Sequence, residues 1–249
     1  MRIRRLSVAT ALVLLAACSG GTSGSSGSGS ITVFAASSLT DAFNEIGKGF
    51  EAANSGAQVT FNYGGSSILV QQIGAGAPAD VLATADETTM QQAVTAATVA
   101  EPAMFAHNRL AILVAKGNPK GIRSLADLAR PGLIVVLCAA EVPCGRFGAQ
   151  ALDKAGATVT PRSLEANVKG VQSKVTLGEA DAGIVYVTDV QSAGDKAEGV
   201  TIPDPQNVVA AYPIAAVRAS ANRDLAAAFV AYVRSAAGRQ VLTQAGFDP

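Results

Sequence analysis

Three segments of the sequence place hydroxyl and backbone N–H groups between an apolar strand and the start of a helical pattern. The three segments are Ser37–Ser38 after the run 31–36, Ser66–Ser67 after the alternating run 58–63, and the loop 138–146 after the run 133–137. The first turn of a helix leaves backbone N–H groups without partners, at the positive end of the helix dipole. Such groups bind anions, so these segments favour the capture of an oxyanion.

Two further positions extend this set of donors. Val168 lies in the first turn of a helix that begins within 165–170, and Tyr186 lies at the carboxyl end of the apolar strand 182–187. The donors expected are the hydroxyl groups of Ser38, Ser66 and Tyr186 and the backbone N–H groups of Ser38, Ser66, Cys144 and Val168. Because none of these positions is a carboxylate, a protonated anion would lack a strong acceptor. Molybdate, tungstate or sulfate is therefore favoured over phosphate.

Each position also has a simpler structural explanation when it is taken alone. Ser38 followed three residues later by Asp41 has the form of a capping box, ahead of a helix with Leu39, Phe43, Ile46 and Phe50 on one face. Ser66 could be an ordinary cap, Val168 a core residue, and Tyr186 a core aromatic whose hydroxyl bonds locally. The interpretation as a binding site depends on the joint occurrence of the four helix starts.

The elements that carry these residues alternate between strands and helices, which predicts βαβ units and an α/β fold with mostly parallel sheets flanked by helices. The buried run 110–115 is predicted to cross into a second lobe, and 211–217 to cross back. Lobe 1 is expected to contain 31–108 plus 213–249, and lobe 2 to contain 109–212. Ligands of such sheets bind beyond the carboxyl ends of the strands, which here places a cleft between the lobes.

The N-terminus has the pattern of an export signal. Arg2, Arg4 and Arg5 precede an apolar run at 6–17, too short to span a bilayer as a mature helix. We expect a signal peptide at 1–17 and lipidation of Cys18, because the preceding Leu-Ala-Ala resembles a lipobox. An ordinary signal peptide is the alternative. The Gly/Ser-rich segment 18–30 would be a flexible tether of about 20 Å, anchoring an exported protein by lipid to the outer face of the cell membrane.

Composition excludes several classes of function. The 249 residues are 49% hydrophobic, and removing three signal arginines from 19 Lys plus Arg, against 19 Asp plus Glu, leaves a net charge of about −3. With no basic patch and no Trp, nucleic-acid binding is not expected. His107, Cys138 and Cys144 have no zinc-ligand spacing, so neither a directly bound metal nor a cofactor is predicted.

Two other classes of function remain as alternatives. A secreted serine hydrolase would use the serines at the helix starts, but Gly-x-Ser-x-Gly is absent and the single histidine, His107, falls in a predicted surface segment. An adhesin or structural lipoprotein would bind no small ligand. The binding of an oxyanion would separate both from the leading hypothesis.

Four motifs give the chain a family resemblance that covers residues 31–247. They are Phe-Ala-Ala-Ser-Ser-Leu-Thr at 34–40, Gly-Ala-Pro-Ala-Asp at 76–80, Val-Pro-Cys-Gly at 142–145 and Gly-Ile-Val-Tyr at 183–186. On these motifs the chain resembles the molybdate-binding proteins of bacterial ABC transporters, which are type II periplasmic binding proteins. The resemblance implies a two-lobed fold, no enzymatic activity, a permease and its ATPase as partners, and a monomeric state.

The resemblance also implies which residues hold the ligand. The positions that bind a tetrahedral oxyanion through hydrogen bonds alone correspond here to Ser38, Ser66, Cys144, Val168 and Tyr186. Cys144 departs from the alanine of the relatives, but a backbone N–H contact tolerates this change. With Cys18 assigned to lipid, Cys138 and Cys144 form an even pair in an exported protein, which favours a disulfide over two free thiols.

Overall fold

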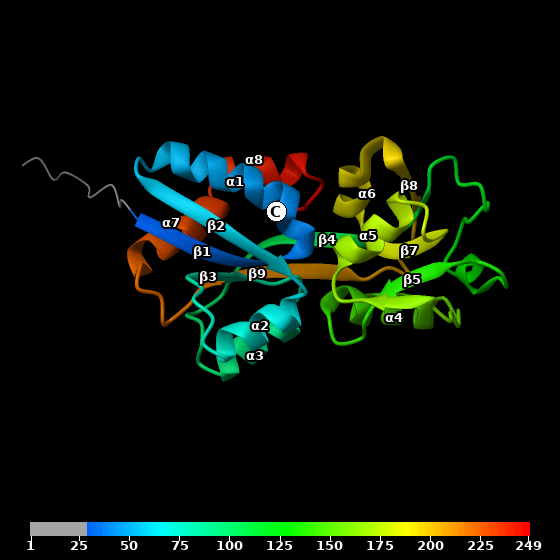
Figure 1. The fold of residues 1–249 in the computed structure, drawn as a ribbon, viewed down its shortest axis with the longest axis horizontal. Helices are drawn as coiled ribbons and strands as arrows, with labels where there is room; N and C mark the ends of the chain where they lie inside the picture. Colours follow the sequence, from blue (N-terminus) through cyan, green and yellow to red (C-terminus); the bar gives the residue numbers. More distant parts are fainter. Residues whose placement is uncertain (1–28) are drawn as a thin grey trace, which may run out of the picture.

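The computed structural model describes residues 29–249 as two lobes joined by two long strands (Figure 1). The predicted signal peptide, Cys18 and the tether up to Ser28 lie outside the described residues. Gly29 and Ser30, which we expected in the tether, instead begin β1 and pair with Ala57 and Gln58 of β2. Within the described range, no helix is long and apolar enough to cross a membrane.

The sheet of lobe 1 combines parallel and antiparallel pairs. Its strands are β1 (Gly29–Ala36), β2 (Ala57–Gly64), β3 (Val81–Ala83), β9 (Val209–Ala216) and the first half of β4 (Ala103–Ala115). β1 runs parallel to β2 and β3, whereas β9 is antiparallel to β3 and β4. β1 lies between β2 and β3, and its residues 33–36 are all buried. Continuous burial is expected for a central parallel strand with both faces covered.

The second half of β4 belongs to the sheet of lobe 2. The other strands there are β5 (Val135–Cys138), β6 (Ser163–Glu165), β7 (Ala182–Tyr186) and β8 (Ala197–Thr201). β4 changes partner between Arg109, opposite Val209 of β9, and Leu110, opposite Tyr186 of β7. This change falls beside the predicted border at 109. β9 already begins at Val209, so residues 209–212 pair within the sheet of lobe 1.

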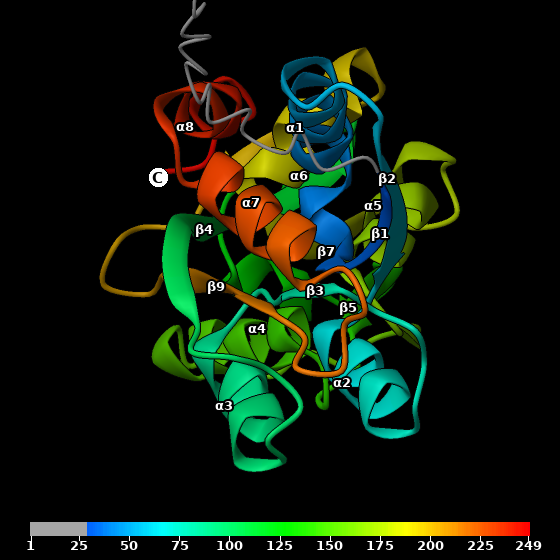
Figure 2. The same cartoon turned by 90° about the vertical axis from the view of Figure 1, so that its left-hand side faces the viewer.

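Helices cover both faces of the lobe 1 sheet (Figure 2). One face carries α1 (Thr40–Ala53), α7 (Arg223–Val233) and α8 (Ala236–Gln244), and the other carries α2 (Ser66–Gly74) and α3 (Glu87–Thr95). As the spacing predicted, Phe43, Ile46 and Phe50 of α1 are buried. They pack toward Phe229 of α7, whose ring centroid lies 5.3 Å from that of Phe50.

Lobe 2 has the same layered construction. α5 (Val168–Thr176) and α6 (Val187–Ala193) pack on one face of its sheet and α4 (Pro143–Lys154) on the other (Figure 1). Short 3₁₀ turns occur at Ser37–Leu39, Ala126–Ala129 and Gly194–Lys196. The helix expected to begin within 165–170 is α5, which begins at Val168, while Glu165 is the last residue of β6.

Candidate functional site

All five predicted ligand-binding residues line one cavity between the lobes. They are Ser38, Ser66, Cys144, Val168 and Tyr186. The rest of the wall is formed by Ala36, Ser37, Gly64, Gly65, Ala85, Val142, Pro143 and Asn167. The empty space is about 210 Å³ including its opening to solvent. The cavity lies where the carboxyl ends of strands from both lobes meet the helices that follow them.

The wall of this cavity is electrically neutral in its side chains but rich in donors. No Lys, Arg, Asp or Glu is among the lining residues. α2, α4 and α5 all begin at the cavity, at Ser66, Pro143 and Val168. Within residues 29–249 the backbone N–H groups expected to face the ligand make no turn, loop or cap hydrogen bond to another backbone group; they belong to Ser38, Ser66, Cys144 and Val168. The cavity is therefore suited to an anion and not to a cation.

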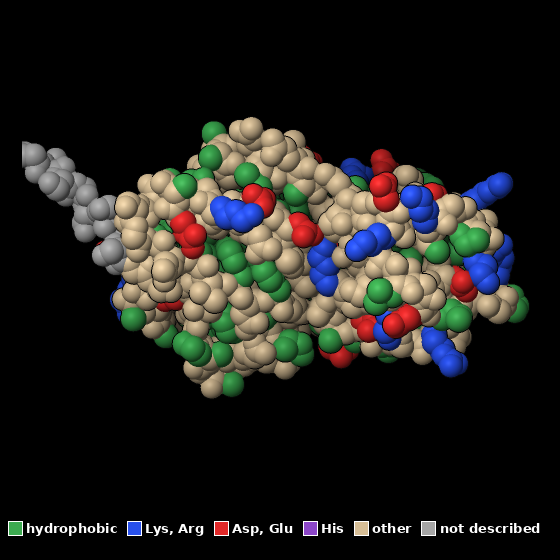
Figure 3. All heavy atoms as spheres, turned by 45° about the horizontal axis from the view of Figure 1, so that its top comes forward, with side chains coloured by type: hydrophobic (Ala, Val, Ile, Leu, Met, Phe, Trp, Pro, Cys, Tyr) green, Lys and Arg blue, Asp and Glu red, His purple; other side chains and the backbone are tan. Residues whose placement is uncertain are grey.

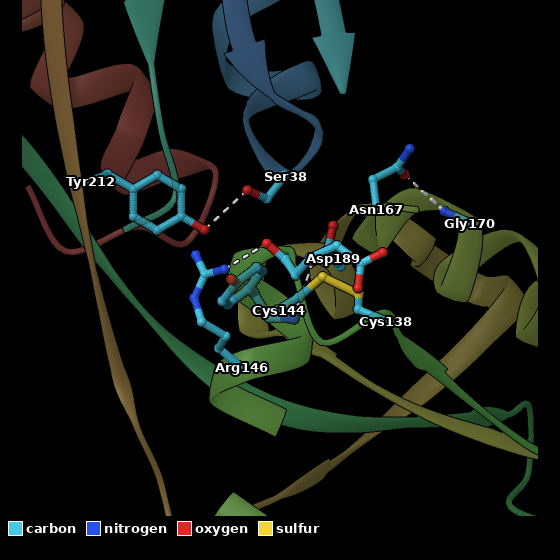
Figure 4. The surroundings of a disulfide bond; sticks show 10 residues. Ser38, Cys138, Cys144, Arg146, Asn167, Gly170, Asp189 and Tyr212 are labelled. Atoms are coloured by element: carbon cyan, nitrogen blue, oxygen red, sulfur yellow. Dashed lines mark hydrogen bonds between the residues drawn. A yellow bond between two sulfur atoms is a disulfide. The ribbon is translucent and has the colours of Figure 1, made fainter. Parts of the chain in front are cut away.

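Three hydroxyl groups add to these donors. Ser66 Oγ accepts a hydrogen bond from the Ala85 N–H at 3.0 Å, which leaves its own proton free to donate. Ser38 Oγ lies 3.0 Å from Tyr212 Oη, and Figure 4 shows Tyr212 pointing toward Ser38. Tyr186 Oη is buried and has no hydrogen-bond partner among the described residues. A buried hydroxyl without a hydrogen-bond partner destabilises a folded protein unless a ligand or a water molecule supplies that hydrogen bond.

Both tyrosines of this region remain neutral phenols. Burial raises the pKa of Tyr186 well above its ordinary value, and Tyr212 and Asp189 nearby raise it further. Burial likewise raises the pKa of Tyr212. Each phenol therefore keeps its proton at physiological pH and can donate a hydrogen bond.

The capping box predicted for Ser38 and Asp41 is wrong. β1 runs into a 3₁₀ turn, and α1 begins only at Thr40, with no side-chain cap. The Asp41 carboxylate instead accepts from Lys169 Nζ of lobe 2 at 2.9 Å. Because the Ser38 side chain is not used as a cap, its hydroxyl is available to Tyr212 and the cavity.

A disulfide holds the first turn of α4 against the end of β5. Cys138, the last residue of β5, is joined to Cys144 with 5.8 Å between their Cα atoms (Figure 4). The loop packs closely on the helix, since a Cβ on Gly145 would come within 1.9 Å of the Ala139 carbonyl oxygen. The disulfide and this close packing together fix the position of the Cys144 N–H.

Sequence reasoning missed two residues that shape the site. Tyr212 was assigned only to the strand that crosses back, because the patterns contain no signal that it faces Ser38. Asn167 lies within a predicted helix, but it is the N-cap of α5 and accepts from the Gly170 N–H at 3.1 Å. An Asn immediately before a helical repeat is a cap signal that could have located this start.

No metal centre accompanies the cavity in the part of the chain that the structure describes. There, no group of three or more His, Cys, Asp or Glu side chains could hold a metal ion. His107 pairs through its backbone with Asp248, outside the cavity wall. A hydrolytic site with His107 as the base is therefore not assembled around Ser38 or Ser66.

A buried carboxylate lies behind Tyr186. Asp189 is 0% exposed, and one oxygen accepts from the Tyr186 N–H at 3.1 Å. Its other oxygen has no hydrogen bond among residues 29–249 and lies 3.5 Å from Lys169 Nζ. Burial raises the pKa of Asp189 to about 6, although Lys169 opposes the shift.

This raised pKa predicts a pH-dependent contribution to stability. The pKa of an aspartate in an unfolded chain is about 3.9, so between about pH 4 and pH 6 the folded state binds more protons. The contribution of Asp189 to the free energy of unfolding is therefore lost as pH rises through that window, by up to about 3 kcal/mol. Urea unfolding of Asp189→Asn and wild type from pH 4 to 7 should show the variant gaining relative stability with pH. The exposed Asp195→Asn control should show the same dependence of unfolding free energy on pH as the wild type. If the unfolding free energies of Asp189→Asn and wild type differ by the same amount at every pH, the raised pKa of Asp189 is contradicted.

The sequence matches a family model over nearly the whole described chain. Residues 31–248 match the family described as bacterial extracellular solute-binding protein. The molybdate-binding protein ModA of Mycobacterium tuberculosis is 46% identical over 222 residues, covering 89% of this chain and 85% of the relative. The molybdate-binding protein ModA of Escherichia coli is 31% identical over 230 residues, covering 88% of this chain and 89% of the relative.

A solved structure supports the fold independently. The periplasmic molybdate-binding protein of Azotobacter vinelandii superposes with a TM-score of 0.77 at 21% identity, covering 88% of this chain and 99% of that one. The two-lobed α/β architecture of periplasmic binding proteins is thereby confirmed. Taken with the neutral cavity between the lobes, these matches show that the chain belongs to the bacterial extracellular solute-binding proteins, which bind transported solutes and are not enzymes.

Proposed function

We propose that this protein is an extracytoplasmic receptor that captures molybdate and delivers it to the permease of an ABC transporter. The observation that carries the proposal is the cavity wall, which offers neutral donors and helix starts and has no charged side chain among its described residues. An anion bound there would be held by hydrogen bonds alone. Tyr186 Oη, which is buried and has no hydrogen-bond partner within residues 29–249, would donate a hydrogen bond to one of the anion's oxygens.

The number of helix starts suits a doubly charged anion. Each helix N-terminus carries roughly half a positive charge. Three full helices and the turn before α1 therefore supply up to about two positive charges. Phosphate near neutral pH still carries a proton and needs an acceptor. Because no carboxylate lines the cavity, that proton would be left without a strong partner.

Size is the property proposed to separate molybdate from sulfate. Donors fixed to helix ends and to a disulfide-bound turn cannot move inward easily, so the smaller sulfate ion would bind with longer hydrogen bonds. Tungstate, which resembles molybdate in size and charge, is proposed as a second ligand. The mycobacterial relative, which is named for molybdate, supports molybdate as the principal solute.

Export and membrane attachment form the second part of the proposal. The N-terminal pattern supports lipidation of Cys18, which would tether the lobes to the outer face of the cell membrane. Membership of the solute-binding family implies an ABC permease and its ATPase as partners. The receptor is proposed to act as a monomer, with no cofactor beyond its oxyanion ligand.

Parallel titration of the protein lacking residues 1–17 with molybdate, tungstate, sulfate and phosphate tests this function. Isothermal calorimetry should give one site per chain, with molybdate and tungstate bound much more tightly than sulfate or phosphate. Melting temperature should rise with the same order of ligands, because binding to the native state alone stabilises by RT ln(1 + [L]/Kd). Equal or tighter binding of sulfate would identify the protein as a sulfate receptor. No binding of any oxyanion would refute the proposal.

Gly65 tests whether the ligand is bound between closed lobes. It is the N-cap of α2, and a Cβ there would lie 2.4 Å from the Ala166 carbonyl oxygen and 2.8 Å from Val142 Cγ1, both in lobe 2. Its φ of −67° suits any residue, so Gly65→Ala should fold normally. Molybdate affinity should fall at least about tenfold because the methyl group holds the lobes apart.

The control for this variant lies at the other end of the same helix. A Cβ on Gly74 meets nothing within 4 Å, so Gly74→Ala should bind molybdate as the wild type does. Both variants are compared by calorimetry, with melting of the ligand-free protein as the test of folding. Wild-type affinity in Gly65→Ala would show that the lobes do not close over the ligand at this contact.

A further inference from the structure

Two ion pairs cross the cleft beside the cavity, each from a lobe 2 helix that begins there. Arg146 of α4 reaches Asp86 at the start of α3, and Lys169 of α5 reaches Asp41 of α1. None of these four side chains lines the cavity. Both pairs can form only when the lobes are together, since each joins one lobe to the other.

The two pairs differ strongly in their surroundings. Asp86 is 4% exposed and Arg146 27% exposed, whereas Asp41 is 59% exposed. Exposed ion pairs contribute little to the stability of the state that forms them. Removing one partner of a buried pair costs far more, because the other charge stays buried without compensation. The Arg146 pair is therefore the one able to influence closure.

The hydrogen bonds of Arg146 tie the cavity wall of lobe 2 to that of lobe 1. Its guanidinium donates to the Asp86 carboxylate, to Thr89 Oγ1 at 2.8 Å and to the Glu141 carbonyl oxygen at 2.6 Å. Asp86 also caps α3 by accepting from the Thr89 N–H at 2.9 Å. Arg146 lies two residues after Cys144, so the contact holds the helix start that carries the Cys144 N–H.

We propose that Arg146 is a positioning residue that couples lobe closure to oxyanion binding through Asp86, without touching the ligand. This inference rests on the proposed function and deepens it. When the lobes separate, Asp86 and Arg146 are both hydrated, and loss of either costs little. When the lobes close, Asp86 becomes buried and requires its cation. A ligand that binds only the closed form loses affinity in proportion to the closed population.

A long-range attraction between the Arg146 charge and the anion is the competing explanation, and Asp86→Asn separates the two. Asparagine keeps the N-cap of α3, because it accepts from the Thr89 N–H as aspartate does. Removing the negative charge of Asp86 makes the region more positive. If Arg146 acted only through its charge, Asp86→Asn would bind molybdate as tightly as the wild type or more tightly. If the Arg146–Asp86 pair drives closure, Asp86→Asn binds molybdate more weakly than the wild type.

The test is calorimetric titration of molybdate into the wild type, Arg146→Gln, Asp86→Asn and the double variant. We expect Kd to rise at least about tenfold in Arg146→Gln, where Asp86 is left buried and unpaired, and a few-fold in Asp86→Asn, where Arg146 keeps partial hydration. The double variant buries no unpaired charge. Its Kd should therefore lie between that of the wild type and that of Arg146→Gln. Asp41→Asn, which removes the exposed inter-lobe pair, should stay within about twofold.

Several outcomes would overturn this role for Arg146. They are a Kd within twofold of wild type in Arg146→Gln, tighter binding in Asp86→Asn, or additive losses in the double variant. Melting of the ligand-free variants, expected to stay close to that of the wild type, separates a loss of closure from a loss of folding. Failure of the wild-type protein to bind molybdate would instead refute the proposed function.

Discussion

The structure depends on one constraint: several helix starts meet at a common cavity, and their first backbone N–H groups make no turn, loop or cap hydrogen bond to another backbone group within residues 29–249. Unpaired donors that are removed from water destabilise a fold, so such an arrangement persists only where something else accepts from them. Among the described residues of the cavity wall there is no carboxylate to accept from them. In the proposed function, an anion of suitable size accepts hydrogen bonds from all these donors together.

The rest of the fold positions these donors. Strands that end at the cavity point their following helices toward it, and the crossing strands β4 and β9 bring parts of the chain from both lobes together. Tyr212 of β9 orients the Ser38 hydroxyl, while the disulfide fixes the turn that contains Cys144. Outside the cavity, acidic and basic side chains are interspersed on the face drawn in Figure 3. In the proposed function, the placement of the helix ends provides the selectivity of the site.

Much of this arrangement could be predicted from the sequence. Strand runs that stop at serines, and the order of the helix starts, singled out Ser66, Cys144, Val168 and Tyr186, and the structure places all four on one cavity wall. Their contact with a ligand stays a prediction. The cap at Ser38 was predicted wrongly, because the spacing to Asp41 fits a capping box equally well when the helix begins two residues later. Contacts between distant segments, such as Ser38 with Tyr212 or Arg146 with Asp86, leave no periodic pattern. Only the folded structure reveals them.

The most direct test is an X-ray structure of the protein crystallised with molybdate, with anomalous data collected at the molybdenum absorption edge. The account predicts one dominant molybdenum peak in the cavity, with oxygens in hydrogen-bond contact with the Ser66 and Val168 N–H groups and with Tyr186 Oη. A dominant peak beside a cluster of lysines or arginines, or no peak in the cavity at saturating molybdate, would contradict it.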